Sequence, residues 1–552
     1  MNYSMLLNRS FTMKKIYLVS SSLLILMALM SGCGKKMAQS HSETKAMAYE
    51  EVSEAVMMPE PMEYRGGNID ANVMYNAPIQ MPSVAVVAPN TESYKHNEQN
   101  KFIEVSSSPL STFSTDVDTA SYSNVRRMLD ANSLPPKDAV RTEEFVNYFS
   151  YNYKEPTTNE PFFINLKVDD ALWNKKHKLI QIGLQSKKAN IEKLPPSNLV
   201  FLLDVSGSMN DENKLPLLKK SLKLLVNQLR AEDKVSIVVY AGSSGLVLDR
   251  AKGSEKEKII SALDKLEAGG STAGGEGIRL AYEIAKKSFI KNGNNRVILA
   301  TDGDFNVGQS SESELIELIE EKKKSGVYLS ILGFGMGNYK DDKVEALADK
   351  GNGNYAYIDN LLEAKKVLVT QMSGTLYTVA KDVKVQVEFN PQKVSSYRLL
   401  GYENRKMANE DFNDDKKDAG EVGMGHSVTA LYEVVLNDGT NSSKVDKLKY
   451  QTAVVNPSDE LATVKIRYKE PKANSSKLMS RVVSFQNSDI SDVDSKFIQS
   501  VVGFSMILRN VEEKGDLTYN KVLSLAKASK GSDDEGYRAE FIKMIENAML
   551  SK

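Results

Sequence analysis

The sequence predicts an α/β fold built on a doubly wound parallel sheet, and two observations in the middle of the chain indicate it. Apolar runs such as residues 198–204 are nearly continuous, which is typical of strands that are covered on both faces. Segments with apolar residues three or four positions apart follow these runs, as in residues 215–229, and this spacing predicts helices. Strands that alternate with helices predict a parallel sheet with helices on both faces.

The predicted elements of this domain follow one another without long gaps. The expected strands are residues 198–204, 235–241, 246–248, 296–301, 328–333 and 355–358. The expected helices are residues 215–229, 255–266, a segment from the glycine-rich turn 269–275 to about 289, 312–324 and 341–348. We place the domain at residues 197–375.

Segments on both sides of this domain predict a β-rich domain with a helical C-terminal part. Alternation of apolar and polar residues predicts strands at residues 162–168, 178–184, 383–389, 430–436 and 462–468. A two-stranded hairpin is marginal alone, so we hypothesise that both flanks form one β-sandwich into which the α/β domain is inserted. Separate N- and C-terminal modules are the simpler alternative. Beyond residue 492 the apolar spacing becomes helical, and an amphipathic helix is expected near residues 540–550.

Composition excludes several classes of protein. The chain has 552 residues, with 71 Lys and Arg against 72 Asp and Glu, so it lacks the basic excess of a nucleic-acid-binding protein. One Cys excludes an intramolecular disulfide and a Cys-rich zinc site. Four scattered His residues argue against a multi-histidine metal site. The length exceeds what one core supports and predicts several domains.

The N-terminus resembles the signal of a bacterial lipoprotein. Two lysines precede an apolar run at residues 16–30, which is short for a membrane span but suits the core of a signal peptide. The run ends in Met-Ser-Gly-Cys at residues 30–33, which resembles a lipobox and implies that Cys33 is lipidated. We expect a signal peptide at 1–33 and a lipid-anchored protein of the cell envelope, facing the periplasm or the outside. Gly34 is not a retention aspartate, which favours the outer membrane in a two-membrane bacterium. An ordinary signal peptide or a short anchor helix is the alternative.

The following segment, residues 34–108, has no helical or strand period and is rich in Met, Ser, Glu, Asn and Pro. Such a stretch cannot bury enough apolar surface to offset its ordering entropy, so we expect a disordered tether; a Met-rich copper-binding tract is the alternative. The expected order continues with helices and strands at 109–196, the α/β domain, and the β-rich and helical domain at 376–552.

Three loops at the carboxyl ends of the predicted strands carry oxygen side chains. Asp204, Ser206 and Ser208 form a D-x-S-G-S turn, Thr272 lies in the glycine-rich turn, and Asp302 follows a later strand. Ligands of parallel sheets bind at this edge. Carboxylate and hydroxyl oxygens without Cys or His suit a hard cation such as Mg²⁺, and Mn²⁺ and Ca²⁺ take similar ligands. Two carboxylates balance one divalent charge.

Residues 197–374 resemble a von Willebrand factor type A domain, because the three loops match its metal-ion-dependent adhesion site in order. The resemblance implies that these five residues hold a divalent cation and that an Asp or Glu of a protein partner completes its coordination. Residues 113–122 lead into an expected helix, and residues 140–149 begin another. This run is similar to the N-terminal segment of a bacterial envelope family of type A-domain proteins, which also has a C-terminal extension; the likeness covers the chain from about residue 111 to the end. Asp116 and Asp118 precede a helix in that N-terminal segment. We expect them to serve in capping and hydrogen bonding; a second metal site is the alternative.

These observations favour a non-enzymatic, metal-dependent adhesion or scaffold lipoprotein of the bacterial envelope. Its expected partners are a protein presenting Asp or Glu and the membrane that holds the lipid anchor. A metal-stabilised structural domain is one alternative, and a Mg²⁺-dependent hydrolase is another. Hydrolases that resemble haloacid dehalogenases carry a second Asp where this chain has Ser206, a poor proton carrier. No G-x-S-x-G, H-E-x-x-H or P-loop occurs in the sequence.

Overall fold

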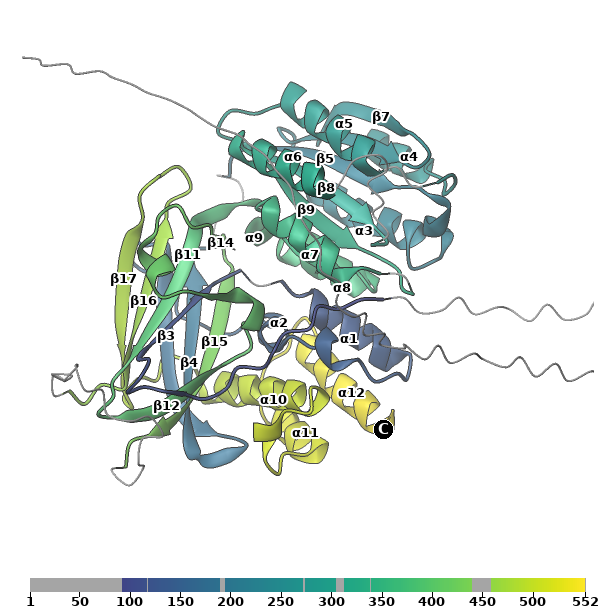
Figure 1. The fold of residues 1–552 in the computed structure, drawn as a ribbon. Coiled ribbons are helices and arrows are strands. Elements are labelled where there is room, and N and C mark those ends of the chain that lie inside the picture. The colour runs from purple at the N-terminus through teal and green to yellow at the C-terminus, as the bar shows by residue number, and fades with distance from the viewer. Residues whose placement is uncertain are drawn as a thin grey trace, which may run out of the picture. The chain divides into compact units, whose positions relative to one another are not determined.

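The computed structural model describes most of the chain after residue 91 (Figure 1). The described residues are 92–116, 118–188, 194–271, 274–303, 312–337, 339–438 and 458–551. The predicted signal peptide, Cys33 and tether residues 34–91 lie outside them. None of the described helices combines the length and the apolar character that crossing a membrane requires.

A six-stranded sheet forms the α/β domain. Its strands are β5 (Ser197–Asp204), β6 (Lys234–Tyr240), β7 (Ser244–Lys252), β8 (Asn294–Thr301), β9 (Val327–Gly333) and β10 (Tyr355–Tyr357), in the order β10-β9-β8-β5-β6-β7. All neighbours are parallel except β7, which runs antiparallel to β6. The doubly wound fold is therefore confirmed. The strand predicted at 246–248 was too short. The polar residues on both sides of it also belong to β7, because they pair with β6 in a hairpin.

Helices cover both faces of this sheet (Figure 1). One apolar cluster joins the sheet to α3 (Leu215–Gln228), α4 (Lys256–Asp264), α8 (Leu361–Lys365) and the π-helix η4 (Lys366–Thr370). The other joins it to α5 (Gly274–Lys287), α6 (Glu312–Lys324) and α7 (Asp341–Lys350). Every residue of β5 and β8 is buried, which explains why these strands read as continuous apolar runs. A short helix, α9 (Met372–Leu376), ends the domain.

Strands from before and after the α/β domain pair with one another in two antiparallel sheets. The first contains β1 (Ile103–Glu104), β12 (Val394–Leu400), β15 (Ser427–Leu436), β4 (Asn174–Ser186) and β3 (Phe162–Ala171), in this order. The second contains β13 (Lys406–Met407), β2 (Leu110–Ser114), β11 (Thr378–Phe389), β16 (Ala462–Lys469) and β17 (Lys477–Val483), with β14 (Gly420–Gly423) beside β11. Pairs such as Ile182 with Ala430 join the two flanks, and both sheets share one apolar core. The pairing agrees with the insertion hypothesis and not with separate modules.

A helical part packs against this sandwich. It consists of α1 (Ala120–Asp130), α2 (Thr142–Asn147), α10 (Asp492–Leu508), α11 (Tyr519–Ala528) and α12 (Tyr537–Leu550), which share one apolar cluster. Phe149 packs edge to face against Phe497 and Phe541, with ring centroids 5.0 and 5.6 Å away. The expected C-terminal helices are confirmed. Short 3₁₀ helices are η1 (Lys137–Ala139), η3 (Gly207–Asn210), η5 (Glu403–Arg405), η6 (Glu410–Asn413) and η7 (Glu512–Lys514).

Residues 92–108, the last part of the predicted tether, contact the folded part of the chain. The Ser93 amide donates to the carbonyl oxygen of Tyr339 at 3.2 Å, and β1 pairs with β12. Val105 is buried in the sandwich core. The prediction of a disordered tether is therefore wrong for these residues. They are ordered by contacts with distant segments of the chain, and such contacts need no helical or strand period in the local sequence.

Candidate metal centre

The candidate metal centre lies where two adjacent strands of the α/β sheet end. β5 and β8 are parallel, and Leu203 pairs with Ala300, so Asp204 and Asp302 emerge at the same edge of the sheet. Both carboxylates are fully buried. The structure thus brings together the first and third loops that the sequence predicted.

Asp204 holds the first loop in place with one oxygen and leaves the other without a strong partner. Its Oδ1 accepts a hydrogen bond from the Ser206 amide at 2.9 Å. Its Oδ2 is buried and receives no hydrogen bond of normal geometry from a described residue, although the Tyr240 hydroxyl is near enough to lower the pKa of the carboxyl group. Burial raises the pKa of Asp204 to about 6, and the charge of Asp302 adds to the rise.

The two serines of the first loop lie side by side. Their Oγ atoms are 3.0 Å apart, with Ser206 buried and Ser208 exposed. Met209, which follows them in η3, is fully buried in the apolar cluster beneath α3. This anchor fixes the turn, so that both hydroxyl groups stay at the edge where the carboxylates lie.

Thr272 lies outside the described residues, but the loop that leads to it does not. The Gly269 amide donates to the carbonyl oxygen of Val205 at 2.7 Å, and the Gly207 amide donates to that of Gly270 at 3.0 Å. Gly270 has a φ of +83°, a conformation that glycine adopts without steric cost. The first loop and the start of the second are therefore joined by backbone hydrogen bonds.

Lys214 is a member of this site that the sequence analysis missed. Its Nζ donates to Asp302 Oδ2 at 3.1 Å and to the carbonyl oxygen of Ser208 at 2.9 Å. The side chain is buried under Gly335, where an added Cβ would come within 2.4 Å of Lys214 Cε. A lysine just before a helix is not distinctive in a sequence. Only its position, six residues after Ser208, could have indicated that it lies near the site.

The donors of this site fit a hard divalent cation. The described members are the carboxylates of Asp204 and Asp302 and the hydroxyls of Ser206 and Ser208, and all of these offer oxygen. Oxygen ligands with few carboxylates are what Mg²⁺ accepts when water fills its remaining positions. The buried Oδ2 of Asp204 is the atom that most needs such a partner. The described residues contain no group of three or more His, Cys, Asp or Glu side chains that could hold a metal ion.

Asp116 and Asp118 belong to a different arrangement from the one expected. The Thr119 side chain at the start of α1 makes no capping hydrogen bond, and the Ser121 amide of the first turn donates to Glu144 Oε2 at 2.8 Å. The described contacts of Asp116 and Asp118 thus include no capping bond, whereas the expected hydrogen bonding is confirmed. Asp118 instead accepts a hydrogen bond from the Tyr355 amide at 3.0 Å. Arg405 lies 3.2 Å from Asp116 and 3.5 Å from Asp118. An arginine of the chain thus occupies the position that a second cation would need.

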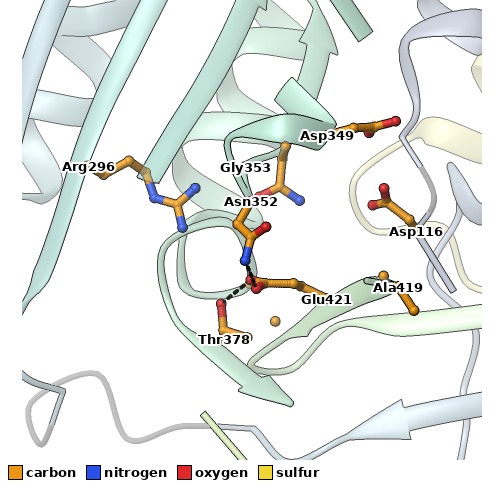
Figure 2. Close-up of a pocket in the computed structure, with 12 residues that line it drawn as sticks. Asp116, Arg296, Asp349, Asn352, Gly353, Thr378, Ala419 and Glu421 are labelled. Carbon is orange, nitrogen blue, oxygen red and sulfur yellow. Dashed lines mark hydrogen bonds between the residues drawn. The ribbon is translucent and has the colours of Figure 1, made fainter. Parts of the chain in front are cut away.

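A small polar cavity of about 40 Å³ lies at the opposite, amino-terminal edge of the sheet (Figure 2). Glu421 accepts hydrogen bonds from Asn352 Nδ2 at 2.6 Å and Thr378 Oγ1 at 3.0 Å. Arg296 donates to Ser330 Oγ at 2.6 Å, while its buried Nε has no hydrogen-bond partner among the described residues. Burial raises the pKa of Glu421 to about 7 and lowers that of Arg296. This cavity pairs an acid with a base and does not resemble a cation site.

Three family descriptions match successive parts of the chain. Residues 198–371 match "von Willebrand factor type A domain", residues 88–181 match "von Willebrand factor", and residues 374–550 match "Uncharacterized protein YfbK, C-terminal". The first of these ranges coincides with the α/β domain that carries the candidate metal centre. The other two cover the segments that build the sandwich and the helical part.

Individual proteins resemble the chain to different extents. The uncharacterized protein YfbK of Escherichia coli K12 is 44% identical over 474 residues, which cover 84% of this chain and 82% of that protein. Human inter-alpha-trypsin inhibitor heavy chain H3 is 24% identical over 47% of this chain and 29% of its own length. A structure of proximal thread matrix protein 1 from the mussel byssus, with a zinc-occupied adhesion-site motif, covers 32% of this chain and 44% of its own at 24% identity and a TM-score of 0.27. The chain belongs to the family of YfbK-like proteins, with a von Willebrand factor type A domain and a C-terminal extension.

Proposed function

We propose that the chain is a non-enzymatic protein-binding module, in which a divalent cation bridges the α/β domain to an acidic residue of a partner protein. The proposed ligands are Asp204, Ser206, Ser208, Thr272 and Asp302. The observation that carries the proposal is the buried Oδ2 of Asp204, which lies beside a second buried carboxylate and lacks a hydrogen-bond donor of normal geometry among the described residues.

Mg²⁺ is the cation that we propose first. Two carboxylates balance its charge, and the hydroxyl ligands add none, so the bound ion is not surrounded by surplus negative charge. Mg²⁺ keeps water in the positions that the protein does not fill, and a partner carboxylate can replace one such water. Mn²⁺ and Ca²⁺ accept the same oxygen donors, and competition between the three ions would rank them.

The contacts of Ser206 support a binding role over hydrolysis. Its hydroxyl lies 3.0 Å from the hydroxyl of Ser208 and close enough to the Asp204 carboxylate to lower the pKa of that group, and its contacts with described residues include no histidine. The nearby Lys214 ammonium already donates to Asp302 and to the Ser208 carbonyl oxygen. The described part of the site therefore lacks the serine–histidine pair that activates many serine nucleophiles.

Capture of partner proteins tests this proposal. Immobilised wild-type protein, Asp204→Ala and a control variant with an exposed substitution on the other face, Lys286→Ala, would be incubated with an extract of the source organism. We expect the wild type and the control to capture the same proteins in Mg²⁺, and capture to disappear in EDTA or with Asp204→Ala. Equal capture under all conditions would contradict the metal bridge. If EDTA only lowers the melting temperature, the structural alternative is supported instead.

We also propose that the chain is a lipoprotein of the bacterial envelope, anchored through Cys33 and held in the outer membrane where two membranes exist. The support is the short apolar run that ends in Met-Ser-Gly-Cys. Metabolic labelling with an alkyne fatty acid would test it. Label in the wild type and none in Cys33→Ser is expected, whereas label in both or in neither would contradict the proposal.

A further inference from the structure

A groove of about 550 Å³ borders the candidate metal centre. One end is formed by Asn210, which is two residues beyond Ser208, and by Ala268, which directly precedes Gly269 in the second site loop. From there the groove follows α3 toward Lys223. The groove thus begins beside the first and second loops of the site.

The wall that α3 contributes is basic. Lys219, Lys220 and Lys223 line the groove, and α3 contains no acidic residue. Lys219 Nζ donates to the carbonyl oxygens of Asp264 and Leu266 at 2.9 and 2.8 Å, which leaves its positive charge without a carboxylate. Lys220 is exposed and forms no ion pair with a described residue.

The rest of the groove is apolar with two acids. Leu215, Pro216 and Leu266 form its apolar lining. Asp264 pairs with Lys223 at 2.6 Å, and Glu267 is exposed. One acid is therefore already compensated, and the lysines exceed the acids in the lining. A groove whose lining has more lysines than acids, and which begins beside a cation site, attracts negative charge.

We propose that this groove binds an acidic, extended segment of the partner protein, whose leading Asp or Glu reaches the cation while later acidic side chains lie along α3. The proposal rests on the proposed function. The nine residues from Leu215 to Lys223 span about 12 Å along the helix, a length that about four residues of extended chain cover. A segment of that length places alternate side chains on the lysines, and the others on the apolar lining.

A short fluorescein-labelled peptide that alternates Glu and Ala is the probe, with a Gln–Ala peptide of equal length as its neutral match. Fluorescence anisotropy in Mg²⁺ should show binding of the acidic peptide to the wild type and little binding of the neutral one. Lys220→Glu with Lys223→Glu should weaken binding about tenfold, which corresponds to about 1.4 kcal/mol. The matched control is Lys286→Glu with Lys287→Glu at the end of α5, on the other face of the sheet. It makes the same change in net charge and should change the affinity for the acidic peptide less than about twofold.

The single change Lys220→Glu keeps the test valid if the double variant unfolds, because Lys220 forms no ion pair with a described residue; it should weaken binding about threefold. Equal losses in the double variant and the control, or equal binding of both peptides, would overturn the groove proposal. Loss of binding in EDTA without an effect of the lysine changes would overturn the groove and leave the metal bridge. A lysine effect that persists in EDTA and in Asp302→Ala would support the groove and contradict the metal bridge.

Discussion

Two groups of buried carboxylates in the α/β domain are compensated in different ways. At the metal centre, Lys214 lies beside Asp302, and no cation of the described residues contacts Asp204. On the segment that leads into α8, Asp359 and Glu363 receive hydrogen bonds of 2.8 Å each from the buried Arg126 of α1. Asp204 Oδ2 thus has neither a cation nor a donor of normal geometry among the described residues. Both carboxylates of the second group are bound by an arginine, although Glu363 Oε1 has no hydrogen-bond partner there.

The contacts of α7 repeat the second pattern. Arg141 pairs with Glu144 at 2.5 Å and also contacts Asp341. Arg405 pairs with Glu345 at 2.8 Å and Asp349 at 2.7 Å. Arginines from the flanking segments thus neutralise the acids of the α/β domain and join the parts of the chain. The comparison teaches that burial of carboxylates alone does not mark a cation site; a buried carboxylate that no cation of the described chain contacts does.

The largest effect is expected from removing the arginine that binds the second group of carboxylates. Arg126→Met leaves Asp359, Glu363 and Glu540 without their shared guanidinium, and we expect the free energy of unfolding to fall by about 3–5 kcal/mol. Urea denaturation would measure it, with exposed Arg279→Met as the control, for which a change below about 1 kcal/mol is expected. A small loss in both variants would mean that these contacts do not hold the parts together.

A smaller effect concerns Glu421 in the cavity at the other edge (Figure 2). Its pKa is about 7 when folded against a usual 4.5, so the folded protein binds this proton more tightly. The resulting stability is present below pH 4.5 and is lost as the pH rises through 7. Relative to the wild type, Glu421→Gln should therefore gain roughly 1–3 kcal/mol between pH 5 and 8. Urea denaturation at each pH would measure the free energy of unfolding of both proteins. A constant difference between them from pH 4 to 8 would contradict this account.

The smallest effect should come from Lys214. Its ammonium repels a cation bound beside Asp302, so Lys214→Met should tighten cation binding by about three- to tenfold. Lys214→Arg keeps the charge and serves as the control. Thermal shifts measured over a range of Mg²⁺ concentrations would compare the variants. Weaker binding by Lys214→Met would show that the ammonium supports the ion instead of competing with it.

Much of the fold could be predicted from the sequence because hydrophobic periodicity follows burial closely. The strands of the α/β domain and its helices α3 to α7 lie within a few residues of their predicted places, whereas α8, η4 and α9 were not predicted. β12 escaped prediction because Arg398 points into the structure and donates to the buried Glu433 at 2.7 Å. A buried ion pair breaks the alternation of apolar and polar residues that reveals a strand.

The site could be predicted in part, since its residues follow strands whose carboxyl ends must meet at one edge. The structure brings Asp204, Ser206, Ser208 and Asp302 together, while Thr272 lies outside the described residues and stays a prediction, as does the role of all five in binding a cation. Lys214 could not be predicted, because its contact with Asp302 depends on how α3 packs.

Isothermal titration of Mg²⁺ into chelator-treated protein tests the central claim most directly. We predict that the wild type binds one cation per chain, and that Asp302→Ala shows no binding heat while its near-UV circular dichroism stays unchanged. Equal binding heats in the two proteins, or none in the wild type with Mg²⁺, Mn²⁺ or Ca²⁺, would contradict the claim that the two buried carboxylates hold a metal ion.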